Sequence, residues 1–254
     1  MDVGRRPEVT VVMPCLNGQR WLDQAIRSVR AQHYGNWEMR IVDDASSDRS
    51  AEIADAHARA DRRITVTHLS QPVGGAAARN EALRKARGRY IAFLDADDWW
   101  RPDKLSIQRM EMQRKGAAFG YTAYEKCDEC SYRCGRFFIP PAWVDYQRLL
   151  RTCVIGCSTV MLDRRRLGQR YLPPLSMAHD FALWLEILRE GHIAHGCPEP
   201  LTVYRERRGS LSANKLVKSL FVWRIYRERE DIDLPRSLAL FASYSVNGLR
   251  KRFI

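Results

Sequence analysis

Short apolar runs alternate with segments of helical periodicity along the first 121 residues. After the first run, apolar residues recur on one helical face at Leu22, Ala25, Ile26 and Val29. The alternation predicts βαβ units, and hence an α/β domain whose mostly parallel central sheet is flanked by helices. The runs are rich in β-branched and aromatic residues, as strands usually are, and they are Val9 to Met13, Glu38 to Val42, Ile64 to Leu69, Tyr90 to Leu94 and Ala117 to Tyr121.

Local signals predict where several helices begin. Ser47 or Asp48 can cap a helix over Ala51 to Ala60, and Pro102 suits the first turn of the next helix. A later apolar pattern predicts a helix from Phe181 to Glu190.

The alternation breaks after Tyr121. Residues 122–140 look like a hairpin insert, and strands are predicted at Ser158 to Leu162 and Leu201 to Tyr204. The last forty residues predict two basic amphipathic helices separated by Pro235. We therefore expect a domain of residues 1–212, with halves at about 1–121 and 122–212, followed by a helical tail of residues 213–254.

Composition and charge narrow the choice of partners. The chain has 254 residues, of which 45% are hydrophobic and 28% are charged, which allows a sizeable core. A formal net charge of +12 favours phosphates, nucleic acid or acidic lipid headgroups. The cysteines number seven and no apolar stretch opens the chain, so we expect a reduced, cytoplasmic setting. No apolar run approaches the roughly 18 residues of a membrane span, so any membrane contact is expected to be peripheral.

Polar clusters follow three of the predicted strands, where an open parallel sheet binds its ligands. Asp95, Ala96, Asp97 and Asp98 follow a buried run, and clustered carboxylates there suit a hard divalent cation such as Mg²⁺ or Mn²⁺. The alternative is an acidic cap on the helix near Pro102.

The second and third clusters suit a nucleotide and its phosphates. The segment Asp43 to Asp48 offers carboxylates to a base or ribose, although a turn with a helix cap explains it equally simply. The segment Gly74 to Asn80 lets the backbone approach a ligand and carries Arg79 toward the cleft, and its alternative is a glycine turn with a solvated arginine.

Four motifs in this order resemble glycosyltransferase family 2, whose members have the GT-A fold. The opening strand and turn from Val9 to Asn17, the loop from Val42 to Asp48, the helix start from Gly74 to Asn80 and the D-x-D of Asp95 to Asp97 are similar to the family's own. The resemblance implies a nucleotide-sugar half, an acceptor half and a nucleotide diphosphate sugar donor, most often a UDP-sugar.

The resemblance also implies roles for individual residues. Asp43 or Asp44 would read the base, Arg79 would support the phosphates, Asp95 would orient the nucleoside, and Asp97, with Asp95 beside it, would hold the metal. The turn of Pro14, Leu16 and Asn17 would flank the base, and Leu16 stands where an aromatic ring is frequent in the family.

The acceptor half would supply the general base. The segment Met177 to Leu185 resembles the family's E-D-x-x-L-W-L, so Asp180 would deprotonate an acceptor hydroxyl and His179 stands where Glu is usual. The alternative is that Asp180 caps its helix. Tyr204 to Ser212 resembles a late segment that closes over the diphosphate, where Arg205 and Arg207 would neutralise phosphate and Arg207 replaces a histidine.

The cysteines and the tail leave alternatives open. Cys127, Cys130 and Cys134 have metal-ligand spacing and lack an obvious fourth ligand, so reduced cysteines in a loop compete with a zinc site. The tail could rest on an anionic membrane or pack against the domain.

The wider match resembles the teichuronic-acid and exopolysaccharide branch, which implies a saccharide or lipid-linked acceptor. Direct displacement would invert the anomeric configuration. The competing hypotheses are a nucleotidyltransferase and a non-enzymatic basic module for nucleic acid, although sheet-edge carboxylates repel a polyanion, so we expect no nucleic-acid partner.

Overall fold

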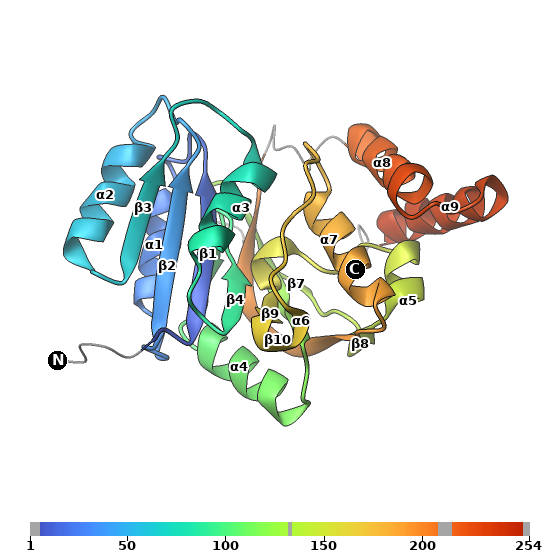
Figure 1. Cartoon of the computed structure of the whole chain (residues 1–254), viewed down its shortest axis with the longest axis horizontal. Helices are drawn as coiled ribbons and strands as arrows, with labels where there is room; N and C mark the ends of the chain where they lie inside the picture. The colour runs from blue at the N-terminus through green and yellow to red at the C-terminus, as the bar shows by residue number, and fades with distance from the viewer. Residues whose placement is uncertain (1–5, 132–133, 208–214, 251–254) are drawn as a thin grey trace.

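The computed structural model describes residues 6–131, 134–207 and 215–250 (Figure 1). Its first half is a parallel sheet in the order β3-β2-β1-β4. The strands are β1 (Val9–Cys15), β2 (Trp37–Asp43), β3 (Ile64–His68) and β4 (Tyr90–Phe93). All four carboxyl ends therefore meet at one edge, as the sequence predicts.

Helices cover both faces of this sheet because successive residues of a strand point to opposite sides. In β1, Val9, Val11 and Met13 join a core with α1 (Leu22–Arg30), α2 (Ser50–Ala60) and α4 (Lys104–Arg114). Val12 joins the opposite core, which contains α3 (Gly75–Lys85) and α7 (His179–Arg189). The helix predicted from Phe181 is therefore confirmed.

The second half continues the same sheet with mixed strand directions, in the order β4-β9-β6-β10-β5. Only the β6 and β10 pair is parallel there, while β9 runs antiparallel to both of its neighbours. The prediction of a mostly parallel sheet thus holds for the first half and is wrong for the second. The strands are β5 (Trp99–Trp100), β6 (Phe119–Asp128), β7 (Cys134–Phe138), β8 (Trp143–Val144), β9 (Met161–Asp163) and β10 (Ala194–Glu206).

Two boundary predictions are corrected by local geometry. The strand expected from Ser158 begins only at Met161, because a 3-10 turn (Cys157–Thr159) holds the preceding residues near the D-x-D loop. The helix α2 has Arg49 at its cap position, while Asp48 accepts from the backbone N–H of Ser50 at 2.9 Å. The strand is therefore shorter than predicted, whereas the helix matches its predicted range and differs only in the residue at the cap position.

The tail packs on the second half of the domain beside α5 (Tyr146–Arg151). It consists of α8 (Lys215–Arg224), a π-helical turn (Ile225–Arg229) and α9 (Leu234–Arg250). Pro235 lies in the first turn of α9, where a proline costs no helical hydrogen bond. The helical structure of the tail is interrupted just before this turn, between Arg229 and Leu234. The expected domain boundary at residue 212 lies outside the described residues.

The β6–β7 hairpin confirms the predicted insert and carries a disulfide between Cys127 and Cys134. The pairing removes two of the thiolates that a zinc site needs, so neither the zinc hypothesis nor the expectation of fully reduced cysteines matches the structure. Cys130 remains a free, exposed thiol.

Candidate active site

A cavity of about 380 Å³ opens at the carboxyl edge of the parallel strands. Both halves of the domain line it: Asp95 and Asp97 follow β4, Arg79 projects from α3, and Asp180 lies in the first turn of α7. A metal ligand and a general base of one reaction must face the same space, and Asp97 and Asp180 line the same cavity.

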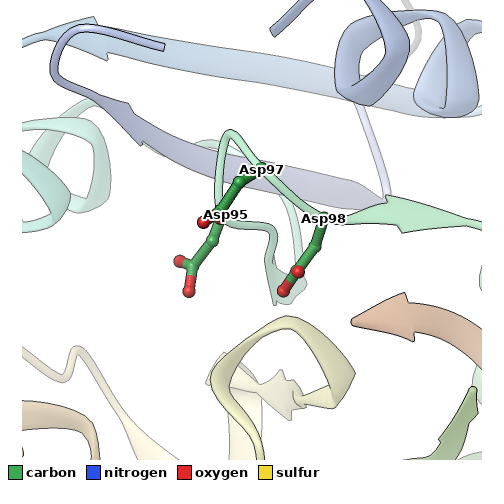
Figure 2. Close-up of side chains that lie close together, drawn as sticks. All are labelled: Asp95, Asp97 and Asp98. Carbon is green, nitrogen blue, oxygen red and sulfur yellow. The ribbon is translucent and has the colours of Figure 1, made fainter. Parts of the chain in front are cut away.

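Three carboxylates project from the single turn between β4 and β5 (Figure 2). One oxygen from each of Asp95, Asp97 and Asp98 lies within 4.8 Å of the others. Asp98 is buried, and its oxygens accept from the hydroxyl of Ser158 at 2.6 Å and the backbone N–H of Arg205 at 2.9 Å. Only Asp95 and Asp97 line the cavity, so Asp98 anchors the turn.

The carboxylate cluster suits a cation. Burial, followed by the nearby charge of Asp95, raises the pKa of Asp97. Burial and the charges of Asp97 and Asp95 raise the pKa of Asp98 well above its ordinary value. Because carboxylates crowded in this way repel, a hard divalent ion would lower the energy of their ionised forms.

Arg207 supplies a positive charge at this cluster. Its Nε lies 2.6 Å from Oδ2 of Asp97, and its guanidinium lies over the ring of Trp21, 4.7 Å from the centroid. A guanidinium cannot ligate a cation. Arg207 therefore competes with a metal for Asp97 while remaining able to bind phosphate.

Arg79 joins the two halves of the site. Its buried guanidinium donates from Nη2 to Asp95 and from Nη1 to Nε2 of His179 at 2.9 Å. Nδ1 of His179 lies 3.3 Å from the carbonyl oxygen of Leu175. A neutral imidazole with its proton on Nδ1 satisfies both contacts. Burial and the charge of Arg79 lower the pKa of His179, which favours that neutral form.

Helix α7 begins at His179 after Ala178, which has a left-handed φ of 55°, and Asp180 is its second residue. Oδ1 of Asp180 accepts from the backbone N–H of Phe181 at 2.8 Å, but the cap position is held by Ala178 and no described side chain caps the helix, so the capping alternative for Asp180 is wrong. Asp180 also lines the cavity, where the carboxylate is available to an incoming hydroxyl. The bond to the N–H of Phe181 uses one oxygen of Asp180, and the carboxylate can still receive a proton.

Comparison with known proteins decides the family. The family described as "Glycosyl transferase family 2" matches residues 10–166. This chain belongs to glycosyltransferase family 2. The match covers the motifs of the first half and the turns that follow them, and the nucleotidyltransferase and nucleic-acid-module hypotheses gain no support from it.

Relatives of this family 2 glycosyltransferase match along nearly its whole length. It is 37% identical over 247 residues to the "Putative teichuronic acid biosynthesis glycosyltransferase TuaG" of Bacillus subtilis, covering 97% of this chain and 98% of that one. It is 36% identical to the "UDP-Glc:alpha-D-GlcNAc-diphosphoundecaprenol beta-1,3-glucosyltransferase WfgD" of Escherichia coli, covering 96% and 94%.

Solved structures confirm the GT-A fold. The S. aureus protein TarS, in complex with UDP-GlcNAc, matches with a TM-score of 0.72 at 18% identity, over 93% of this chain and 71% of that one. The mannosyltransferase PcManGT from Pyrobaculum calidifontis, in complex with GDP-Man and Mn²⁺, matches with a TM-score of 0.68 at 20% identity, over 95% and 71%.

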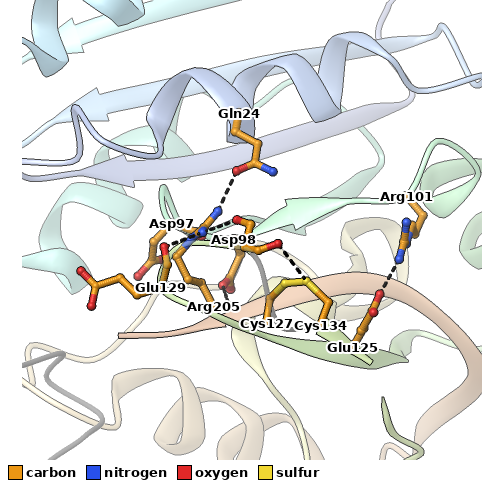
Figure 3. Close-up of a disulfide and its surroundings, with 10 residues drawn as sticks. Gln24, Asp97, Asp98, Arg101, Glu125, Cys127, Glu129, Cys134 and Arg205 are labelled. Carbon is orange, nitrogen blue, oxygen red and sulfur yellow. Dashed lines mark hydrogen bonds and ion pairs between the residues drawn. A yellow bond between two sulfur atoms is a disulfide. The ribbon is translucent and has the colours of Figure 1, made fainter. Parts of the chain in front are cut away.

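In this glycosyltransferase the buried Arg205 side chain joins three separate segments by hydrogen bonds. Its guanidinium donates to Gln24 at 2.7 Å, to the carbonyl of Asp97 at 2.9 Å, and to the carbonyl of Glu129 at 2.9 Å (Figure 3). It also donates to the hydroxyl of Ser131 at 2.6 Å. Since its nitrogens are used within the protein, Arg205 holds the turn of Asp95 to Asp98 against the hairpin, and the guanidinium of Arg207 has fewer partners.

The turn of Pro14 to Asn17 is held by hydrogen bonds to a neighbouring loop. Asn17 has a φ of 51°, and its side-chain oxygen accepts from the backbone N–H of Ser47 at 2.9 Å. Pro14 and Leu16 line the cavity beside it, and Leu16 is half exposed.

The two neighbouring aspartates of the second cluster have different surroundings. Asp43 is buried, faces His68 at 3.3 Å and does not line the cavity. Asp44 does line it, and its carboxylate accepts from the backbone N–H groups of Val73 and Gly74 at 2.7 and 2.9 Å. Asp44 is thus the one of the pair that reaches the cavity, and it also fixes the loop that begins α3.

The sequence analysis did not predict several residues of the site. Trp21 and Gln24 of the first helical segment reach Arg207 and Arg205, and Cys157 joins the cavity wall from a 3-10 turn. No motif marks them, because their roles come from contacts across more than a hundred residues of chain. Only Gly18, which follows Asn17 in the turn, gives a local signal of close packing.

Proposed function

We propose that this enzyme is an inverting glycosyltransferase that transfers a sugar from a UDP-sugar to a hydroxyl of a saccharide or lipid-linked acceptor in cell-surface polysaccharide synthesis. The observation that carries the proposal is the single cavity shared by Asp95, Asp97, Arg79 and Asp180. A carboxylate pair for a metal and a separate carboxylate for a hydroxyl are the two groups that a direct displacement needs. The names of the relatives support a sugar nucleotide and a lipid-linked acceptor.

The donor would lie along the carboxyl edge of the parallel strands. In this arrangement Asp44, Leu16 and Asn17 contact the base, and Arg79 keeps Asp95 oriented toward the nucleoside. Arg207 moves from Asp97 to the diphosphate, where a guanidinium binds phosphate oxygens in pairs. Pro14 fixes the backbone where the base enters, and buried Asp43 supports the loop from behind.

A divalent ion, Mn²⁺ or Mg²⁺, fits Asp97 and Asp95 because their oxygens cluster and their charges repel. When bound, the ion supplies positive charge next to the leaving diphosphate. The protein itself fixes the positions of the two carboxylates relative to each other. The turn does this through Asp98, whose oxygens are bonded to Ser158 and Arg205.

Asp180 takes the proton of the acceptor hydroxyl at a carboxylate oxygen. The hydroxyl oxygen then bonds to the anomeric carbon as the bond from that carbon to the diphosphate oxygen breaks, and the configuration inverts. His179 keeps Arg79 and the start of α7 together, so the base and the donor-binding groups stay at a fixed separation.

The tail is proposed to bring the enzyme to a lipid-linked acceptor at the cytoplasmic face of a membrane. Its helices pack inward through Val222, Ile225 and Tyr226, which agrees with the packing alternative. They also expose Leu220 and Leu238 beside basic residues, which suits an anionic interface. No helix among the described residues is long and apolar enough to cross a membrane. A liposome flotation assay that shows no retention of the protein would contradict the membrane contact.

The experiment that tests the function is a thermal-shift and hydrolysis screen across UDP-, GDP-, dTDP- and CMP-sugars with Mn²⁺, Mg²⁺ or EDTA. We expect stabilisation and slow release of UDP only when a divalent ion is present. The control is Asp97→Asn, which keeps the shape of the site and removes a ligand charge. If no sugar nucleotide binds with either ion, the proposal is wrong.

A further inference from the structure

A second cavity, of about 330 Å³, lies at the opposite edge of the sheet, where β1 and β4 begin. Strand β1 runs seven residues from this edge to the candidate active site, which separates the two cavities by about 20 Å. Five arginines and one carboxylate among the described residues line it, namely Arg6, Arg87, Arg89, Arg164, Arg165 and Glu8.

Two of the five arginines are already paired with carboxylates. Nε of Arg87 donates to Glu38 at 3.0 Å, and Nη2 of Arg89 donates to the buried Asp163 at 2.6 Å. Glu8 has its partners outside the cavity, because it accepts from the hydroxyl of Tyr34 and forms an ion pair with Arg109 at 3.8 Å. These pairs fix the side chains and leave little negative charge facing the space between them.

Three arginines have no carboxylate partner among the described residues. Arg164 donates to the carbonyl of Ala86 at 2.6 Å and to the amide oxygen of Gln169 at 3.4 Å, and neither acceptor carries charge. The guanidinium groups of Arg6 and Arg165 have no acceptor within the part of the chain described. Like charges around one small cavity repel, so an anion bound there would lower the energy of all three.

The walls are also rigid. Gly88 lies between Arg87 and Arg89, and a Cβ at this position would come within 2.5 Å of the backbone nitrogen of Thr10. Only glycine permits this close approach, which seats the start of β4 directly on β1. The arginines therefore project from a fixed frame in which Arg6, Arg87 and Arg89 belong to the first half and Arg164 and Arg165 to the second.

We propose that this cavity binds a small polyphosphate anion, such as pyrophosphate or the polyphosphate chain of a nucleotide, and that the anion bridges the two halves of the domain. Several guanidinium groups match several phosphate oxygens, and the volume lies at the lower limit for ligand sites. A phosphate of a lipid headgroup has the same chemistry. A free anion is favoured because the cavity lies where β1 begins, low in Figure 1, whereas the tail helices α8 and α9 lie at the upper right.

The test is isothermal titration of the full chain with pyrophosphate in the presence of EDTA, which withholds divalent ions from the candidate active site. The variant is Arg6→Gln with Arg165→Gln, because both side chains are exposed and hold no other part of the fold. The matched control is Arg59→Gln with Arg151→Gln, which removes the same charge from exposed positions away from the cavity and outside the tail. We expect the cavity variant to lose about tenfold or more in affinity and the control to stay near the wild type.

The outcomes separate this site from the active site and from a lipid source. The active-site variant Arg207→Gln should keep the wild-type affinity for pyrophosphate. A loss in that variant as large as in the cavity variant, equal losses in the cavity variant and the control, or no binding of pyrophosphate overturns the proposal. If pyrophosphate does not bind but vesicles of phosphatidylglycerol retain the wild type and the control more strongly than the cavity variant, the free anion is ruled out and the phosphate of a lipid headgroup is the ligand of the cavity.

Discussion

Replacing Arg207 with glutamine should tighten the binding of Mn²⁺ to the enzyme without donor and weaken the binding of the donor. The guanidinium of Arg207 lies 2.6 Å from a carboxylate oxygen of Asp97, the proposed metal ligand. A metal ion and an arginine cannot both use that oxygen at full strength, so removing the arginine frees the carboxylate. The donor loses a cation that the diphosphate would otherwise contact.

The size of the effect follows from the geometry. Two unit charges about 4 Å apart interact by about 4 kcal/mol at an effective dielectric constant of about 20. The side chains keep 32% and 20% of their surface exposed, so screening reduces this to about 1 kcal/mol. That energy corresponds to about a fivefold decrease in the dissociation constant for Mn²⁺. Loss of a charge-assisted contact to phosphate should weaken donor binding by about tenfold or more.

The assay is titration of Mn²⁺ into the protein without donor at mildly alkaline pH. Alkaline pH matters because burial and Asp95 raise the pKa of Asp97, and loss of Arg207 would raise it further, so protons compete with the metal at lower pH. The control is Arg136→Gln. Arg136 lies on the β6–β7 hairpin, and its replacement breaks an ion pair of the same length with Glu206 at the end of β10. Unchanged or weaker Mn²⁺ binding in Arg207→Gln, relative to this control, would refute the competition.

Three further predictions test the base, its neighbour and an unusual buried amine. Asp180→Asn should lower kcat by about 10²- to 10⁴-fold while donor binding, measured by thermal shift, stays within error; a parallel loss of donor binding would assign Asp180 a structural role. Because burial and Arg79 lower the pKa of His179 below 6.5, activity should fall only at a pH below that value, as the protonated ring repels Arg79. His179→Gln keeps an acceptor and should lack this acid limb in a pH profile of kcat/KM, and an identical limb in both proteins counts against the assignment. Lys104 is fully buried with Nζ unpaired, 3.7 Å from the ring centroid of Trp100, and burial lowers its pKa well below 10.5. The unfolded chain therefore binds the extra proton, so wild-type stability rises with pH up to about 10.5. Lys104→Met should stabilise the fold at neutral pH by about 1–3 kcal/mol, with an advantage that shrinks toward that pH in thermal melts, and a constant or reversed difference would contradict this reasoning.

Much of the first half could be predicted from the sequence. A strand that is buried on both faces is an apolar run, and a helix beside it repeats its apolar residues with its own period, so β1, α1 and β2 were located to within two residues. The D-x-D cluster was predicted as a cation site from the position of acidic residues after a buried strand. These features depend on neighbours in the chain, which a sequence displays directly.

The second half and the division of labour in the site needed the tertiary structure. Strand direction in β9 and β6 is set by which edge of the sheet is left to pair, and no local pattern records that choice. Arg205 and Arg207 are two residues apart in one motif and both line the cavity, yet the guanidinium of Arg205 is enclosed by the carbonyls of Asp97 and Glu129 while that of Arg207 is paired with the carboxylate of Asp97. The sequence by itself determined which chemical groups stand at the strand ends. Only the folded chain decided which of them are consumed by internal hydrogen bonds and which stay available to a ligand, because burial and pairing depend on segments far apart in the sequence.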